Sequence, residues 1–480
     1  MSDQNKKSFV NLLQEFSIPL IAGVFVALAA ANLAPEAYQY WFGASHDVKH
    51  WEVPGHFAIF GHHLTINFLV NDIFMVFFFG IAAKEIAEAC LPGGSLNPFK
   101  KALNPLCATM GGVVGPVAVF FVAAYFAFQA GLFPEAYSWA DVSKGWGIPT
   151  ATDIALAWLI ARTVFGKGHP AINFLLLLAV ADDAIGLGII AIFYGDPAHP
   201  AEPVWLGLVA LGMVVAFAMR RMSVNKWQPY IFIAGPIAWS GLILAHLHPA
   251  LALVFIVPFL PPPGRDTGLF VKADEVDQDH SDAEHSPLHQ FEHSLKGFVD
   301  FGLFFFALAN AGVAFGGIGP MTWIIFGSLV VGKTVGITGF AWAATKIGLP
   351  LPDRMGMKEL VMAGFIAALG LTVALFVSGA AFPANAELQG QAKMGALFSA
   401  GVAIAAIVIG RAFGLSKSES SVSPSADPAS DQNRPQHNEN PSRQNPDAHP
   451  GALPGGSSSA FASIENEVDE VGNETDQSQG

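Results

Sequence analysis

The sequence predicts an all-α protein that crosses a membrane many times. Of its 480 residues, 52% are hydrophobic and 13% are charged, a composition too apolar for a soluble protein. Apolar runs of about 20 residues, the length a helix needs to cross a bilayer, recur along the chain. Asp153, Asp182 and Asp183 lie inside such runs. Because carboxylates are costly at bilayer depth, we expect these three to serve a function.

About twelve membrane-spanning helices are predicted from these runs. Lys6 and Lys7 precede the first run without a small-residue cleavage site, so we expect that run to remain as a span. Between the first two runs, residues 51–66 alternate apolar and polar side chains around Gly61, which fits a β-hairpin and a plain loop equally well. In chain order, the runs cover residues 17–34, 65–88, 104–128, 148–165, 171–194, 203–220, 228–244, 248–261, 295–315, 322–345, 358–382 and 392–414.

The basic residues predict the orientation of these helices. When successive loops are placed on alternate sides of a membrane, seventeen Lys and Arg residues fall on one side and three, Lys49, Lys144 and Lys393, on the other. Loops rich in Lys and Arg stay in the cytoplasm. Both termini are therefore predicted to be cytoplasmic, in agreement with an even number of spans.

A transmembrane domain is predicted over residues 1–415 and a disordered cytoplasmic tail over residues 416–480. The tail has eleven acidic and three basic residues, and an acidic cytoplasmic loop at 264–296 has eight and three, so these segments supply most of the net charge of −14. The loop contains four histidines that could sense pH, although a solvated linker is the simpler interpretation of the first three: His280, His285, His289 and His293.

Asp182 and Asp183 lie near the middle of the run at 171–194. Desolvation and a second nearby charge both favour the protonated form of a carboxyl group. Such a group can hold a proton or exchange it for Na⁺ or Li⁺, since hard cations prefer oxygen ligands. Neighbouring helix residues point about 100° apart, so one acid can face the ion while the other closes the site or pairs with a cation. Competition between proton and cation, at a site open to one side at a time, makes an exchanger.

The run at 148–165 is predicted to be broken. Pro149, in IPTATDIA, discourages a regular helix near Thr152, and a broken span presents helix ends and backbone carbonyls to an ion. Asp153 and Lys333 are suited to compensate these dipole ends. The alternative for Asp153 is a simple helix cap. The alternative for Lys333 is snorkelling to an interface, but we favour an ion pair with one acid of the adjacent pair.

The second predicted span also contains charges. Asp72 lies near its extracytoplasmic end, and Lys84, Glu85 and Glu88 lie near its cytoplasmic end. The last three are interpreted most simply as interfacial charges, with Glu85 as a candidate for the mouth of an entry funnel. Asp300, in a later span, is expected to face protein or water.

The chain resembles the bacterial NhaA family of sodium/proton antiporters over about residues 9–414. The resemblance rests on NDIFMVFFFGIAAKE, GIPTATDIA, LAVADDAIGLGIIAIFY, FFFALANAGV, VVGKTVGI and ALGLTVALFVSGAAF. It implies two inverted-topology repeats, here about 104–194 and 322–414, an architecture already known for this family. Their broken spans, near Thr152 and Gly370, would cross at mid-membrane.

The same resemblance implies roles for individual residues. Na⁺ would bind at Asp182 and Asp183, with Thr152 and Asp153 beside them and Lys333 as the charged partner.

Further roles lie away from the ion site. Glu85 would belong to a pH-responsive entrance, for which Asp72 is a further candidate, and the hairpin at 51–66 would form a homodimer contact. The chain departs from the family pattern at Ala89, where a second Glu is usual, and at Lys84, which replaces an apolar residue. These differences, with the additional acidic loop and tail, concern the pH dependence more than the exchange.

We therefore predict a Na⁺(Li⁺)/H⁺ antiporter of the bacterial inner membrane that exports sodium in exchange for external protons. We expect it to be electrogenic and pH-regulated and to contribute to sodium and pH homeostasis. It is predicted to be a transporter and not an enzyme, without a cofactor or a nucleic-acid partner, and to act as a homodimer in the lipid bilayer. Cys90 and Cys107 have no spacing that indicates a disulfide framework or a zinc site.

The sequence argues against two other functions that buried acids or this architecture could serve. An intramembrane aspartyl protease also uses buried acids, but it needs them on separate helices, and its Gly-x-Gly-Asp motif does not occur in the sequence. A symporter for an organic anion needs a cationic or amide-lined cavity, whereas the predicted midplane offers mainly carboxylates and one lysine.

Overall fold

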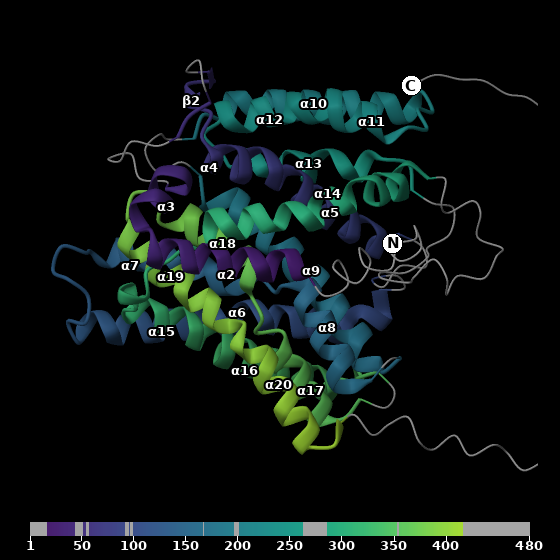
Figure 1. Cartoon of the computed structure of the whole chain (residues 1–480). Coiled ribbons are helices and arrows are strands. Elements are labelled where there is room, and N and C mark those ends of the chain that lie inside the picture. The colour runs from purple at the N-terminus through teal and green to yellow at the C-terminus, as the bar shows by residue number, and fades with distance from the viewer. Residues whose placement is uncertain are drawn as a thin grey trace, which may run out of the picture. The chain divides into compact units, whose positions relative to one another are not determined.

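The computed structural model describes residues 17–43, 51–53, 57–91, 96, 99–166, 168–195, 201–262, 286–352 and 355–415. Helices account for almost all of the secondary structure in these ranges (Figure 1). The one sheet among them is a small antiparallel hairpin of β1 (Ala58–Ile59) and β2 (His62–His63). The predicted all-α class is confirmed.

The first half of the described chain contains several helices of membrane-spanning length. The segment from Ile66 to Cys90 is one such helix, although its local winding changes along its length. In chain order, the elements are α2 (Ile18–Leu33), α3 (Pro35–Phe42), α4 (Ile66–Phe68), η1 (Leu69–Phe74), α5 (Met75–Cys90), α6 (Phe99–Gln129), α7 (Trp139–Ser143), η2 (Lys144–Thr150), α8 (Ile154–Phe165) and α9 (Pro170–Phe193).

The second half continues in the same way. At the top of Figure 1, α10, α12 and α13 pack against one another. The elements are η3 (Pro203–Trp205), α10 (Leu206–Arg221), α11 (Trp227–Pro229), η4 (Tyr230–Ala234), α12 (Gly235–Leu244), η5 (Pro249–Leu251), α13 (Ala252–Ile256), η6 (Val257–Phe259), α14 (Pro287–Asn310), η7 (Phe315–Gly317), α15 (Pro320–Gly327), η8 (Ser328–Lys333), α16 (Thr334–Lys346), α17 (Met357–Ile366), α18 (Leu371–Ala381), α19 (Ala386–Ser399) and α20 (Gly401–Ala412).

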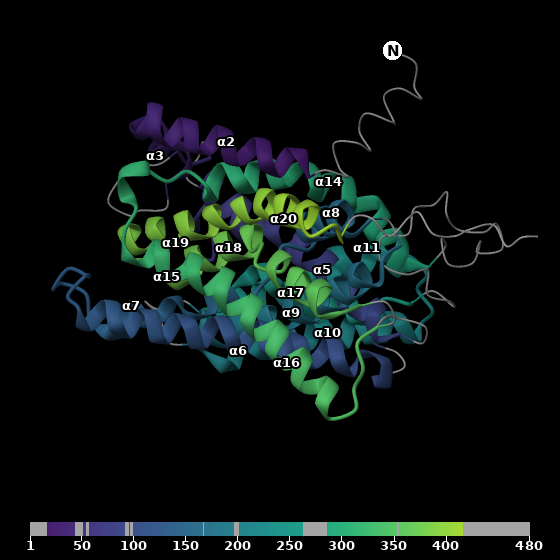
Figure 2. The same cartoon turned by 90° about the horizontal axis from the view of Figure 1, so that it is seen from below.

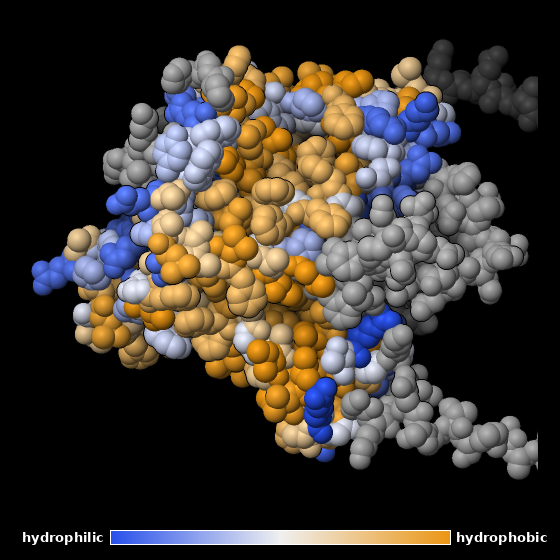
Figure 3. Space-filling view, in the orientation of Figure 1, coloured by the Kyte–Doolittle hydropathy of each residue, from blue (hydrophilic) through white to orange (hydrophobic). Residues whose placement is uncertain are grey.

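Length and hydropathy identify the helices that can cross a membrane. Among the described residues, six single helices qualify, and two bent pairs raise the number to eight spans. Figure 3 shows why such helices suit a bilayer: apolar residues cover most of this face, and hydrophilic residues gather toward its left and right margins. Phe25, Phe126 and Ile192 are among the large apolar side chains that are exposed. The predicted total of about twelve spans stays a prediction.

Two sets of three elements follow the same order, a long helix, a broken helix and a long helix. The first set runs from α6 through the bent pair at 139–165 to α9, and the second from α15–α16 through the bent pair at 357–381 to α19–α20. The bends are 49° and 48°. The predicted breaks near Thr152 and Gly370 are therefore both present.

Glycines bring the first helices of the two sets into close contact (Figure 2). A Cβ atom on Gly115 would collide with the backbone carbonyl of Gly332, and one on Gly336 would collide with that of Gly111. Within each helix the two glycines are four residues apart, Gly111 with Gly115 and Gly332 with Gly336, the spacing that lets membrane helices approach closely. The contact between α6 and the η8–α16 segment thus depends on the absence of side chains.

The structure corrects one predicted boundary. The span predicted at 295–315 is the helix α14, which begins eight residues earlier, at Pro287, and ends at Asn310. Ser286 caps it by accepting a hydrogen bond from the His289 N–H at 3.2 Å, and Pro287 suits the first helical position. The last part of the predicted acidic loop at 264–296 is therefore helical.

The predicted hairpin, acidic loop and tail lie only partly within the residues that the structure describes. The hairpin alternative for residues 51–66 is confirmed, with Phe60 and Gly61 at positive φ in the turn. Residues 263–285, including His280 and His285, and the predicted tail at 416–480 lie outside the described residues.

Candidate functional site

The two helix breaks touch each other. The backbone N–H of Asp153, in the first break, donates a hydrogen bond to the carbonyl of Leu369, in the second, at 2.6 Å. The Thr152 hydroxyl lies 3.0 Å from the carbonyl oxygen of Ala367. Backbone groups that lose their helical partners at one break are therefore satisfied by the other, as a low-dielectric interior requires.

Asp153 binds the beginnings of two half-helices. Its Oδ1 accepts a hydrogen bond from the Leu156 N–H at 3.1 Å, which caps α8. Its Oδ2 accepts from the Thr372 hydroxyl at 2.9 Å and from the Thr372 N–H at 3.3 Å, in the first turn of α18. The carboxylate thus lies between two positive helix ends, where a negative charge is stabilised. Both the cap and the dipole interpretations of Asp153 describe this geometry.

Lys333 lies at the carbonyl end of the first half of the first broken helix. It is the last residue of η8, a short π-helix, and π-helical turns inside α-helices are frequent at functional sites. Its ammonium group donates to the Thr150 carbonyl oxygen at 2.7 Å and to the Thr152 hydroxyl at 2.8 Å, and it forms an ion pair with Asp182. The side chain is fully buried. Lys333 does not snorkel: its charge stays inside the protein, at a helix C-terminal carbonyl.

The adjacent acids on α9 are only partly satisfied. Asp182 is fully buried, and its Oδ2 accepts from Lys333 and lies 2.8 Å from the Thr152 hydroxyl. The second oxygen, Oδ1, has no hydrogen-bond partner in the described structure, and the same is true of Oδ1 of Asp183. A buried oxygen without a partner needs an explanation, and a bound ion or a proton-transfer role is one such explanation.

The donor set suits a small hard cation. Among the described residues, no three Asp, Glu, His or Cys side chains gather as a metal-binding group. Any ion held by Asp182 and Asp183 would therefore take its remaining ligands from hydroxyl or carbonyl oxygens, and Thr152 lies beside Asp182. Oxygen ligands of this kind are what Na⁺ and Li⁺ require, by analogy with other hard cations.

Glu85 belongs to a buried charge cluster, which the interpretation as simple interfacial charges did not predict. The ammonium group of Lys84 lies 2.7 Å from Glu88 and 3.6 Å from Glu85, and it forms an ion pair with Glu292 of α14. Lys84, Glu85 and Glu88 are 2%, 8% and 4% exposed. Packing of α14 against α5 encloses them. The sequence analysis missed Glu292 because it assigned that residue to the loop.

Asp72 lies in a different place. Its carboxylate is 3.8 Å from Nδ1 of His248, and its backbone carbonyl accepts from the Trp239 indole at 2.8 Å. Together with Lys393 and Asn310, these acid and imidazole groups line a cavity of about 290 Å³. Lys393 was assigned to the outer side, at the edge of the run predicted at 392–414, and the structure buries its side chain on α19. None of the residues of the acid pair, nor Lys333, lines this cavity.

Comparisons with known proteins agree with the geometry. A profile of the family described as Na⁺/H⁺ antiporter 1 matches residues 7–411. A protein of Geobacter sulfurreducens named Na(+)/H(+) antiporter NhaA is 55% identical, over 84% of this chain and 97% of its own length. A protein of the same name from Desulfitobacterium hafniense is 55% identical, over 87% of this chain and 98% of its own length. Another, from a Jannaschia species, is 42% identical, over 85% of this chain and 99% of its own length.

Proposed function

The chain belongs to the Na⁺/H⁺ antiporter 1 family, also named NhaA, and on this basis we propose that it exports Na⁺ or Li⁺ in exchange for external protons. It is a multi-pass transporter of the bacterial inner membrane and not a catalytic enzyme. We further propose that both termini are cytoplasmic, as the excess of basic residues on one side of the spans suggests.

One observation supports this proposal most strongly. Asp182 and Asp183 each keep an unpartnered oxygen inside the protein, next to two helix breaks that bind each other. Asp153, beside them, has hydrogen-bond partners for both of its oxygens. We assign the unpartnered oxygens to the transported ion or proton, and the satisfied acid to holding the breaks together.

Transport would follow from competition at these oxygens. With the site open to the cytoplasm, protons leave Asp182, Asp183 or Lys333, and Na⁺ binds the two carboxylates with the Thr152 oxygen nearby. The two sets of helices then move relative to each other and open the site outward, where protons displace the ion. Lys333 compensates the carboxylate charge when no ion is bound. If two protons leave for each Na⁺ bound, the exchange is electrogenic.

The remaining predicted residues receive roles outside the ion site. We assign Glu85, with Lys84, Glu88 and Glu292, to the entrance through which cytoplasmic pH regulates exchange, because this cluster holds three acids around one buried ammonium. Asp72, which lines the cavity with His248, is a candidate for the opposite access path. The β1–β2 hairpin is our candidate for a homodimer contact.

Reconstituted protein can test the assignment directly. Proteoliposomes loaded with a pH indicator should release luminal protons when Na⁺ or Li⁺ is added outside and not when K⁺ is added. Asp183→Asn should abolish this response, whereas Asp300→Asn, which changes an acid on α14 outside the site, should retain it. Exchange by Asp183→Asn at the wild-type rate would reject the assignment. Repeating the assay with a clamped membrane potential tests electrogenicity.

A further inference from the structure

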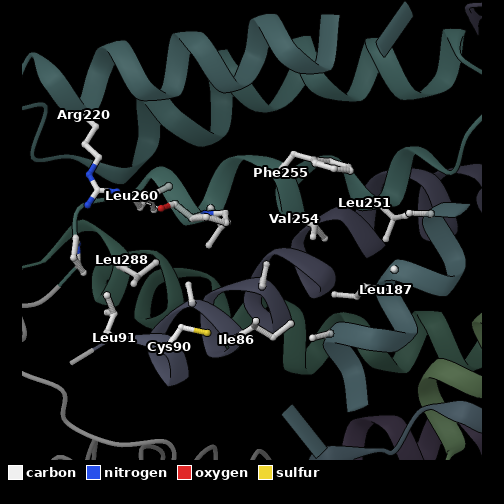
Figure 4. A pocket seen from close by; sticks show the side chains of 18 residues that line it. Ile86, Cys90, Leu91, Leu187, Arg220, Leu251, Val254, Phe255, Leu260 and Leu288 are labelled. Carbon is white, nitrogen blue, oxygen red and sulfur yellow. Dashed lines mark hydrogen bonds between the residues drawn. The ribbon is translucent and has the colours of Figure 1, made fainter. Parts of the chain in front are cut away.

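A second cavity lies between α9 and the helices packed beside it. Its volume is about 550 Å³, within the range of about 300–1,000 Å³ that is usual for ligand pockets. The lining is almost entirely aliphatic and aromatic (Figure 4), and it includes Ile86, Leu187, Val254 and Phe255. Neither Asp182 nor Asp183 lines it, so the cavity is distinct from the acid site.

The charge in this cavity is confined to one end. Arg220, at the end of α10, lies at one extremity in Figure 4, near Leu260 and Leu288, while Leu187 and Leu251 lie toward the other. The guanidinium donates one long hydrogen bond, 3.4 Å, to the Pro258 carbonyl oxygen. No carboxylate in the described part of the chain forms an ion pair with it. Arg220 therefore has N–H groups available for an anion.

The far part of the cavity is open space beside α9. A Cβ atom added to Gly188 would meet no heavy atom within 4 Å. Ala184 and Leu187 line the same side, and Ala184 directly follows Asp183. A long apolar molecule that starts at Arg220 can therefore extend to the helix that holds the acid pair.

We propose that this cavity binds one long-chain fatty acid, with its carboxylate on Arg220 and its alkyl chain between α13, α5 and α9. Charge complementarity selects the head group, because Arg220 is the only charged residue among the described residues that line the cavity. The apolar lining selects an alkyl chain over a polar solute. A chain in this position contacts α9 next to the acid pair and hinders movement of α9 against α13. Where the exchange proposed above operates, the fatty acid slows it.

Cys90 allows binding to be measured without transport. Its thiol is exposed and lines the cavity near the Arg220 end. Cys107 is the one other cysteine in the sequence, so Cys107→Ser leaves a single thiol. In this background, oleate should slow the reaction of Cys90 with a maleimide. Methyl oleate, which lacks the charge, should need an about tenfold higher concentration for the same protection, as expected for one charge-assisted contact.

Two variants locate the ligand. Arg220→Gln, at an exposed position, should make oleate and methyl oleate equally weak protectants. Gly188→Leu should fill the cavity and remove protection by both, whereas Gly207→Leu, which also enters open space but lies outside the lining, should not. Equal protection by acid and ester in the parent protein would overturn the proposal, as would undiminished protection in Gly188→Leu. Protection by oleoyl lysophosphatidylglycerol but not by oleate would assign the cavity to a membrane lipid instead.

Discussion

Replacing Lys333 by Met should leave the Asp182 carboxylate buried without its cationic partner. The lysine ammonium group binds three oxygens, those of Thr150, Thr152 and Asp182, and both members of the ion pair are fully buried. Removing one member of such a pair costs about 3–5 kcal/mol, mainly because the other charge remains buried. For a chain of this size, the midpoint of thermal unfolding should fall by roughly 3–6 °C.

A double variant separates the ion pair from other effects of the substitution. Asp182→Asn removes the charge that Lys333→Met leaves unpaired, so the combined loss of stability should be smaller than the sum of the single losses by about 1–3 kcal/mol. Unfolding of the purified proteins in one detergent, at one scan rate and followed by tryptophan fluorescence, gives all four midpoints. Strictly additive midpoint shifts would refute the coupling between the two residues.

Two further predictions concern the helix breaks and the glycine contact. Thr372→Val should lower the free energy of unfolding by about 1–2 kcal/mol, because Asp153 loses a buried hydroxyl donor. Thr345→Val, at an exposed hydroxyl, should have little effect. Equal unfolding midpoints for the two variants would contradict this. Gly115→Val should destabilise the folded protein by about 1–3 kcal/mol or more, since the new side chain meets the backbone of the facing helix. In Gly339→Val the new side chain enters open space, so little effect is expected. Equal yields of folded protein in detergent for the two variants would argue against the close contact.

Charged residues in apolar runs were the most informative part of the sequence. Thr152, Asp182 and Lys333 come from three separate segments, and the structure brings them within hydrogen-bonding distance of one another. Asp153 binds Thr372, in the second broken helix, instead. Each was found from the cost of a charge at bilayer depth or from Pro149 in the first break. The pairing of Lys333 with Asp182 rather than with Asp183 depends on helix rotation, which the sequence pattern alone does not determine.

Sequence analysis missed several residues for the same reason: their contacts are with residues that are distant in the chain. Thr372 is an ordinary helix residue until the second break places it against Asp153. Glu292 was assigned to a loop, although Ser286 and Pro287 together are a helix-start signal that would have placed it on α14. Lys393 was counted only toward the orientation, as a cation of the outer side, because it lies at the edge of an apolar run.

The central claim is that Na⁺ and protons compete for the oxygens of Asp182 and Asp183. Titration of the detergent-purified protein with NaCl, in weakly buffered solution at several pH values, measures both the bound ion and the released protons. The account predicts proton release on Na⁺ binding, an apparent Kd that rises by about tenfold per unit fall in pH for each proton displaced, and neither effect in Asp183→Asn. Na⁺ binding that releases no protons and is independent of pH would contradict it.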